Sequence, residues 1–139
     1  MSDNVNSRKT VLLVDDDELH LEITKMALKD EYEVFMIKSG KEALEFLNKK
    51  QIVPDIILLD ILMPEMDGWI VFDRIHDIAA LEFTPIMFYT SLEEQNAKEK
   101  AYELGAFDYI DKPCERTILK SKIKDTLKKA ELRKASYNK

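Results

Sequence analysis

The sequence predicts an α/β fold in which helices cover both faces of a single parallel sheet. Short apolar runs alternate along the chain with segments whose apolar residues recur at helical spacing. Most of the apolar runs stop abruptly at polar residues, as buried strands do when they leave a sheet. These observations also exclude a membrane span, since no run approaches the roughly 20 apolar residues that a span needs.

The first part of the chain predicts two strand–helix pairs. Thr10–Val14 is an apolar run that stops at three acids and is typical of a buried strand. In the helix that follows, Asp17 is in position to cap the N-terminus. The apolar face of this helix is predicted from residues at helical spacing, namely Leu19, Ile23, Met26 and Ala27. Residues 32–37 predict the second strand, and Gly40 opens the second helix.

The remainder predicts three further pairs. Residues 55–59 predict a third, fully buried strand that ends at Asp60, and Pro64 and Gly68 break the loop before the next helix. Residues 85–89 and 107–110 predict the fourth and fifth strands. Between them, a weakly apolar helix ends at Gly105, which is typical of a left-handed cap. The last helix is predicted to bury Leu119, Ile123, Leu127 and Ala130.

Five alternating pairs restrict the topology. Because crossovers between parallel strands are right-handed, the natural arrangement is a flavodoxin-like (βα)5 doubly wound sheet with strand order 2-1-3-4-5. We expect a flexible N-terminal tail over residues 1–9, one domain over 10–134 and a C-terminal tail over 135–139.

The composition narrows the function classes. A net charge of −6 argues against direct nucleic-acid binding, because phosphate backbones need a positive footprint. The single Cys114 rules out an internal disulfide and fits a reducing compartment. The polar start of the chain has no signal-peptide core. The expectation is a cytoplasmic protein without membrane insertion.

The candidate site consists of polar residues that end the predicted strands. They are Asp15 and Asp16 after the first strand, Asp60 after the third, Thr90 after the fourth and Lys112 after the fifth. In an open parallel sheet these ends share one edge, where ligands bind at the switch point between the first and third strands. The three aspartates should therefore face one another.

The chemistry of such a cluster is restricted. Carboxylates at close range repel one another unless a cation or a proton intervenes, and oxygen ligands without nearby His or Cys favour Mg²⁺. A carboxylate beside Mg²⁺ can attack phosphorus and form an acyl phosphate. The charge that develops on the phosphoryl oxygens needs a cation and a hydroxyl, and Lys112 and Thr90 are the candidates at the same edge.

Four segments in the same order carry a family resemblance: VLLVDDDEL, PDIILLDILMPEMDG, PIMFYTS and GAFDYIDKP. Together they resemble the motif blocks of receiver domains of response regulators in two-component signalling, over about residues 10–130. The resemblance implies that Asp60 is the phosphoacceptor. It implies a Mg²⁺ cofactor held by Asp60, by Asp16 directly, by Asp15 mainly through water, and by the backbone carbonyl of Leu62.

The same resemblance implies further roles. Thr90 and Lys112 would bind the phosphoryl group, Thr90 and Tyr109 would act as switch residues, and Pro113 would follow a cis peptide bond. The implied phosphodonor is a histidine kinase or a histidine phosphotransfer protein, and the downstream target is unknown. Such a protein is a signalling switch that catalyses only its own phosphoryl transfer and a slow autodephosphorylation, rather than an enzyme with turnover.

Two other functions remain open from the sequence. A haloacid-dehalogenase-like phosphatase would use Asp15 as nucleophile in the Asp15-x-Asp17 pattern, but it needs an acidic metal-binding pair after Lys112 that is not evident. A pseudo-receiver would keep the fold as a binding module without phosphorylation, and would usually lack an acid, the Thr or the Lys.

Some residues have simpler interpretations. Tyr109 could be plain core packing, and His20 and His76 are predicted to be ordinary surface or boundary residues away from the strand ends. Two positions that vary within the family and influence hydrolysis of the acyl phosphate are Leu62 and Leu92 here. Because apolar side chains cannot orient a water molecule, we expect a long-lived phosphoryl group.

Overall fold

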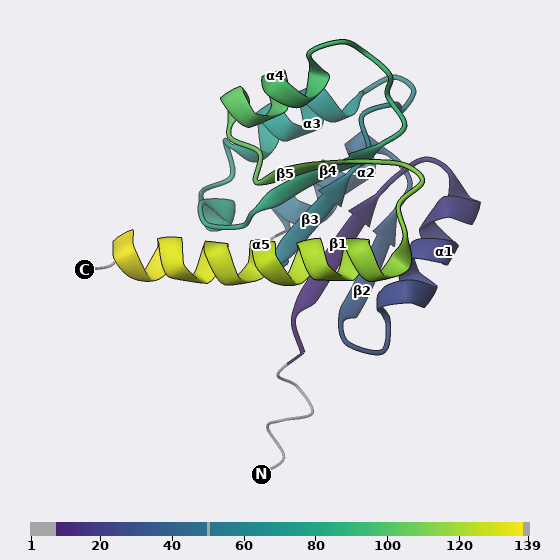
Figure 1. Cartoon of the computed structure of the whole chain (residues 1–139). Helices are drawn as coiled ribbons and strands as arrows, with labels where there is room; N and C mark the ends of the chain where they lie inside the picture. Colours follow the sequence, from purple (N-terminus) through teal and green to yellow (C-terminus); the bar gives the residue numbers. More distant parts are fainter. Residues whose placement is uncertain (1–7, 50, 138–139) are drawn as a thin grey trace.

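The computed structural model describes residues 8–49 and 51–137. Their five-stranded parallel sheet has the order β2-β1-β3-β4-β5, which confirms the predicted topology. The strands are β1 (Thr10–Val14), β2 (Glu33–Ile37), β3 (Ile56–Leu59), β4 (Ile86–Thr90) and β5 (Asp108–Asp111). In Figure 1 the strand arrows point the same way, so their carboxyl ends meet at one edge.

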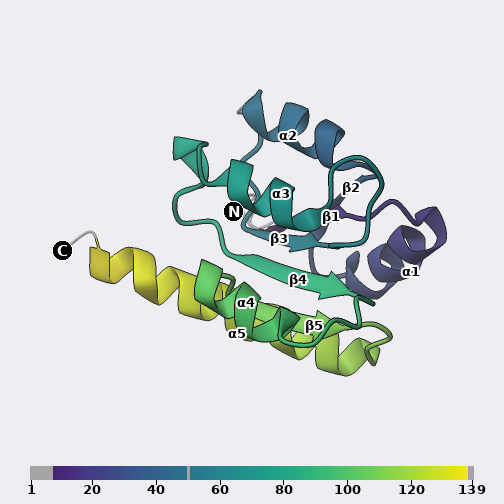
Figure 2. The same cartoon turned by 90° about the horizontal axis from the view of Figure 1, so that it is seen from above.

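Helices cover both faces of the sheet. The helices are α1 (Glu18–Leu28), α2 (Gly40–Asn48), α3 (Gly68–Ile75), α4 (Ala97–Leu104) and α5 (Arg116–Tyr137), with a short 3-10 turn, η2, at Ala79–Leu81. One apolar core joins the sheet to α2, α3 and α4, and the other joins it to α1 and α5. Figure 2 shows α2 and α3 side by side, across the sheet from α5.

The apolar patterning explains the strands. The middle strands β1, β3 and β4 are almost completely buried, as expected for strands with a core on each face. Asp17 caps α1 by accepting a hydrogen bond from the backbone N–H of His20 at 3.2 Å, as predicted. Gly105 ends α4 in a left-handed conformation with φ of 107°, also as predicted.

The predicted apolar face of α1 is wrong for three of its four residues, while the fourth, Ala27, packs against the core. Leu19, Ile23 and Met26 are 70%, 57% and 57% exposed, while Leu21, Thr24 and Leu28 face the core. The helix carries apolar residues on two faces, and the periodic pattern alone did not reveal which one packs on β1. The consequence is an apolar stripe (Leu19, Ile23 and Met26) on the surface.

The ends of the described chain differ in detail from the sequence-based division. α5 continues to Tyr137, so it passes through the predicted domain boundary at residue 134. Lys9, placed in the predicted N-terminal tail, forms an ion pair with Glu131 at 2.7 Å. Most of that tail, residues 1–7, lies outside the described residues. No helix in the described part of the chain has the length and apolarity to cross a membrane.

Candidate phosphorylation site

Three aspartates converge where β1 and β3 end. Asp15, Asp16 and Asp60 each present a carboxylate oxygen within 4.8 Å of the other two. Asp15 and Asp60 are buried, whereas Asp16 is open to solvent. Register explains the convergence, because Val14 pairs with Leu59 on neighbouring strands and the next residues leave the sheet together.

Lys112 supplies the positive charge of the cluster. Its Nζ donates to Asp15 Oδ2 at 2.5 Å and to Asp60 Oδ2 at 3.4 Å, and its side chain is only 9% exposed. The backbone N–H of Lys112 donates to the carbonyl of Thr90 at 2.9 Å, which fixes the end of β5 against the end of β4. Lys112 therefore lies at the same edge of the sheet as the aspartates, as the sequence predicted.

Backbone amides hold the two buried carboxylates. Asp15 Oδ1 accepts from the N–H of Asp17 at 2.9 Å, and Asp60 Oδ1 accepts from the N–H of Leu62 at 3.3 Å. These bonds fix one oxygen of each carboxylate and leave the other directed at Lys112. The role of the Leu62 carbonyl as a metal ligand stays a prediction.

Gly68 closes the loop that follows Asp60. Its N–H donates to the carbonyl of Ile61 at 2.9 Å. A Cβ at this position would lie 2.3 Å from the backbone oxygen of Asp60 and 2.6 Å from Cα of Ile61. The close approach of two backbone segments therefore requires glycine here.

Thr90 and Tyr109 lie beside the cluster in the core. Thr90 is fully buried, and its Oγ1 accepts from the N–H of Leu92 at 3.2 Å. Tyr109 is also buried, with its ring centroid 6.2 Å from that of Phe88. Among the described residues, its hydroxyl is the one buried side-chain polar atom without a hydrogen-bond partner. The peptide bond between Lys112 and Pro113 is cis.

His20 is a residue that the sequence interpretation missed. Its Nδ1 lies 3.6 Å from Asp15 Oδ2, and its ring centroid lies 5.6 Å from that of Tyr89. Burial and the Lys112 ammonium hold the pKa of His20 below its ordinary value. The sequence did contain a signal for this position, namely the N-cap at Asp17. His20 is three residues after this cap, so it lies in the first turn of α1, next to the strand ends. His76, by contrast, lies at the C-terminal end of α3, away from the cluster.

The electrostatics of Asp60 lead to a first prediction. Burial raises the pKa of its carboxyl, against the opposing effects of the Thr90 hydroxyl and the Lys112 ammonium. The carboxyl of Asp60 therefore binds its proton more tightly in the folded state than in the unfolded state. Its contribution to the free energy of unfolding is present at low pH and is lost as the pH rises from the unfolded to the folded pKa. Without divalent cations, Asp60→Asn is expected to raise the unfolding free energy at neutral pH by about 1 kcal/mol.

Urea unfolding of the wild type and Asp60→Asn at two pH values checks this. The stability that Asp60→Asn gains over the wild type should become smaller as the pH is lowered toward the ordinary pKa range of a carboxyl group. If Asp60→Asn were less stable than the wild type at neutral pH, the conclusion that the buried charge of Asp60 destabilises the folded state would be wrong.

The residues fit a hard divalent cation. Every donor in the cluster is a carboxylate oxygen, and two of the three acids are buried. Oxygen-only sets of this kind suit Mg²⁺ rather than softer metals. Asp15, Asp16 and Asp60 could hold such an ion, and its charge would offset their mutual repulsion.

Comparison with known proteins identifies the family of this chain. Residues 11–124 match the family model described as the response regulator receiver domain. The chain is 37% identical over 117 residues to a probable cyclic di-GMP phosphodiesterase of Vibrio cholerae, covering 84% of this chain and 26% of that protein. It is 36% identical over 118 residues to the transcriptional regulatory protein CrdR of Helicobacter pylori, covering 84% of this chain and 54% of that protein.

Solved structures of response regulators also resemble this chain. A putative response regulator from Chloroflexus aurantiacus superimposes with a TM-score of 0.79 at 34% identity, covering 87% of this chain and 98% of that one. A CheY-like response regulator receiver domain protein from Methanospirillum hungatei gives a TM-score of 0.82 at 28% identity, covering 91% and 99%. The chain thus spans about a quarter to about half of the curated relatives but nearly the whole of these solved chains.

Proposed function

This chain belongs to the response regulator receiver domain family, and we propose that it is switched by Mg²⁺-dependent phosphorylation of Asp60. Receiver domains are signalling switches of two-component systems. The observation that carries the proposal is the arrangement of Asp60 beside Asp15 and Asp16, with Lys112 3.4 Å from the Asp60 carboxylate. The family match favours neither the dehalogenase-like phosphatase nor the pseudo-receiver.

The proposed chemistry is a phosphoryl transfer to a carboxylate. A carboxylate oxygen of Asp60 attacks the phosphorus of a phosphohistidine, the P–N bond breaks, and the imidazole leaves with the electron pair and takes up a proton. Lys112 stabilises the charge on the phosphoryl oxygens, and the Thr90 hydroxyl donates to one of them. A bound Mg²⁺ would supply further charge neutralisation to the same oxygens.

Phosphorylation would shift a two-state equilibrium. If Thr90 turns toward the phosphoryl group, it gives up its bond from the N–H of Leu92, so the loop after β4 can move. Tyr109 of β5 packs against Phe88 of the same strand, and α4 and α5 pack on the sheet there. We propose that the face formed by α4, β5 and α5 changes its affinity for a downstream target. The cause would be that the phosphoryl group interacts more favourably with one of the two states than with the other.

Intact-mass spectrometry tests the proposal. The wild type and Asp60→Ala are incubated with acetyl phosphate, with and without Mg²⁺. The expected result is a base-labile phosphoryl adduct on the wild type alone, and only with Mg²⁺. An adduct on neither protein would refute the proposal in favour of a pseudo-receiver.

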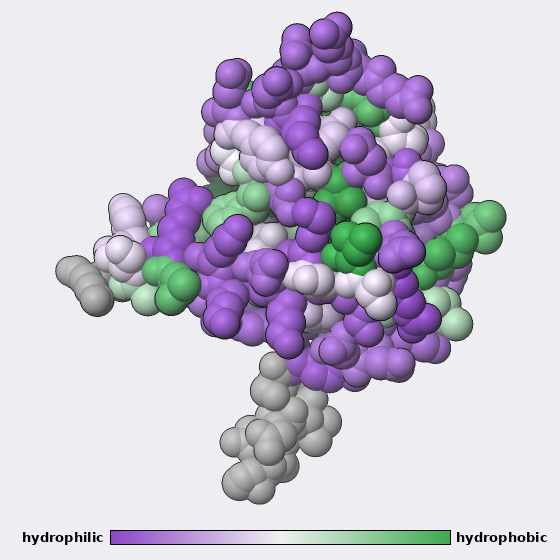
Figure 3. Space-filling model, viewed as in Figure 1, coloured by the Kyte–Doolittle hydropathy of each residue, from purple (hydrophilic) through white to green (hydrophobic). Residues whose placement is uncertain are grey.

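The phosphodonor would dock beside the acidic cluster. A histidine kinase or phosphotransfer protein must bring its phosphohistidine to Asp60, so it must contact the surface around the strand ends. The apolar stripe on α1 begins next to Asp17 there, and Figure 3 shows it as green side chains at the right of the view. Exposed apolar patches of this kind mark interaction surfaces.

The docking proposal gives a second prediction. Ile23→Glu is expected to slow phosphotransfer from a cognate histidine-phosphorylated partner about tenfold, because it places a charge in a desolvated contact. Phosphorylation by acetyl phosphate should be unchanged. The matched control is Leu132→Glu on α5, where the native leucine is 66% exposed. Equal slowing with both phosphodonors would contradict a docking role.

Leu62 and Leu92 give a third prediction, on the phosphoryl lifetime. Both line a hollow of about 470 Å³ beside the loop after Asp60, together with Trp69. Leu62→Asn combined with Leu92→Asn is expected to shorten the half-life of phosphorylated protein several-fold, because amides can orient an attacking water. The decay is followed by intact mass, with Ile118→Asn on α5 as control. An unchanged half-life in the double variant would contradict the role of these leucines.

A further inference from the structure

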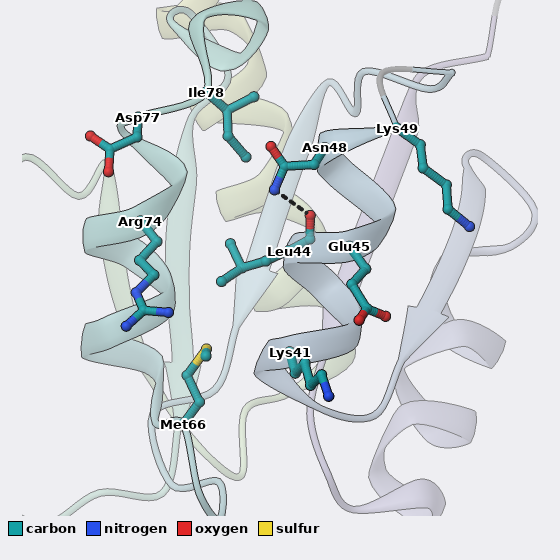
Figure 4. Close-up of a pocket in the computed structure, with 9 residues that line it drawn as sticks. All are labelled: Lys41, Leu44, Glu45, Asn48, Lys49, Met66, Arg74, Asp77 and Ile78. Carbon is teal, nitrogen blue, oxygen red and sulfur yellow. Dashed lines mark hydrogen bonds between the residues drawn. The ribbon is translucent and has the colours of Figure 1, made fainter.

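A separate cavity of about 710 Å³ lies between α2 and α3 (Figure 4). It is closed on its inner side by Leu44, which is 9% exposed, and Ile78, which is 6% exposed. Met66, from the loop that follows β3, lies at one end. The volume is in the range of small-molecule sites, about 300 to 1,000 Å³.

The amide of Asn48 lines the cavity. Figure 4 shows the side chains of Leu44, Asn48 and Ile78 pointing into the space between the two helices. Asn48 Nδ2 donates to the carbonyl of Leu44 at 2.9 Å, which fixes the orientation of the amide. No hydrogen bond to its Oδ1 is found among the described residues, so this oxygen can accept one from a ligand.

Two cations border the Met66 end. Lys41 comes from the first turn of α2, and the guanidinium of Arg74 lies along α3 toward Met66 in Figure 4. Within the described ranges, neither forms an ion pair with a carboxylate within 4.0 Å. Asp77 points away from the cavity. Among the described residues, this end of the cavity therefore carries two cations that no carboxylate pairs within 4.0 Å.

We propose that this cavity binds a small organic monoanion with an apolar body and a carboxylate. The apolar body would cover Leu44 and Ile78, and the carboxylate would lie between Arg74 and Lys41, where a guanidinium can bind it with two hydrogen bonds. Glu45 also lines the cavity, and its negative charge disfavours more highly charged anions. α3 has eight residues and rises about 12 Å, which suits a compact molecule better than a partner helix.

The site is distinct from the acidic cluster but borders the same loop. A Cβ on Gly40 would lie 3.0 Å from the backbone oxygen of Met66, so α2 and this loop are in close contact. A ligand against Met66 therefore contacts the segment that runs from Asp60 to Gly68. The proposal goes beyond phosphorylation and does not depend on it.

A matched pair of probes tests the proposal. Backbone amide NMR of the full chain is titrated with 4-phenylbutyrate and, separately, with the neutral 4-phenyl-1-butanol. The expected shifts centre on the amides of Leu44, Asn48, Met66 and Arg74. The acid is expected to bind about tenfold more tightly than the alcohol.

Variants separate the cavity from non-specific binding. Arg74→Gln should remove the preference for the acid, while Lys98→Gln, which removes a surface charge of the same sign on α4, should leave it intact. Both residues are exposed, so neither change is expected to unfold the chain. Shifts elsewhere on the surface, equal affinity for acid and alcohol, no shifts at millimolar concentrations, or equal effects of the two variants would each overturn the proposal.

Discussion

Lys112→Ala is expected to lower the unfolding free energy of the metal-free protein by about 3 kcal/mol. The change removes the ammonium that lies 2.5 Å from Asp15 and 3.4 Å from Asp60, both of which are buried. Three carboxylates would then share a site with oxygens within 4.8 Å and no cation. Urea unfolding without divalent ions measures the loss.

Three comparisons make this prediction specific. Adding Mg²⁺ should recover part of the lost stability, because a cation returns to the cluster. Asp15→Asn should also recover part of it in the Lys112→Ala background, since it removes one repelling charge. Lys122→Ala is the control: Lys122 lies 3.7 Å from Asp108 with a side chain 44% exposed, so its loss should cost less than about 1 kcal/mol. A similar cost for Lys112→Ala and Lys122→Ala would contradict this description of the site.

Gly68→Ala is expected to cost about 3 kcal/mol or more and to reduce phosphoryl uptake. The added Cβ would lie 2.3 Å from the backbone oxygen of Asp60, and backbone cannot move aside as a flexible side chain can. The loop after β3 would have to shift, which displaces Asp60 and the amide of Leu62 that holds it. Thermal or urea unfolding and intact-mass phosphorylation measure the two effects.

Gly105→Ala provides the matched comparison. Gly105 has φ of 107°, but a Cβ there would meet no atom within 4 Å. Its cost is therefore only that of a left-handed conformation, about 1 kcal/mol, with no effect on phosphorylation. If Gly105→Ala were the more damaging of the two, the close contact assigned to Gly68 would be wrong.

The topology was predictable from the sequence because each strand is a short apolar run that ends at a polar residue. In a parallel sheet with right-handed crossovers, that pattern leaves few arrangements, and the same reasoning brings Asp15, Asp60 and Lys112 together. The sequence also identified the caps at Asp17 and Gly105, because capping depends on local chemistry.

Other features depend on tertiary packing. α1 has two apolar faces, and the one that packs includes the polar Thr24, so periodicity selected the wrong face. The cap at Asp17 places His20 in the first turn of α1, but its contacts with Asp15 of the β1 end and with the ring of Tyr89 on β4 appear only when these segments pack together. The close contact between the backbones at Gly68 and Asp60 could not be predicted, because no pattern of residue types in the sequence indicates it. The cavity between α2 and α3 forms only when both helices pack on the sheet.

The most direct test of the central claim is to locate the acyl phosphate. The protein is phosphorylated with acetyl phosphate and Mg²⁺ and then treated with borohydride, which reduces an aspartyl phosphate to homoserine, and the modified residue is found by peptide sequencing in a mass spectrometer. We predict homoserine at position 60 alone. Homoserine at position 15 would instead identify Asp15 as the nucleophile and contradict the proposed function.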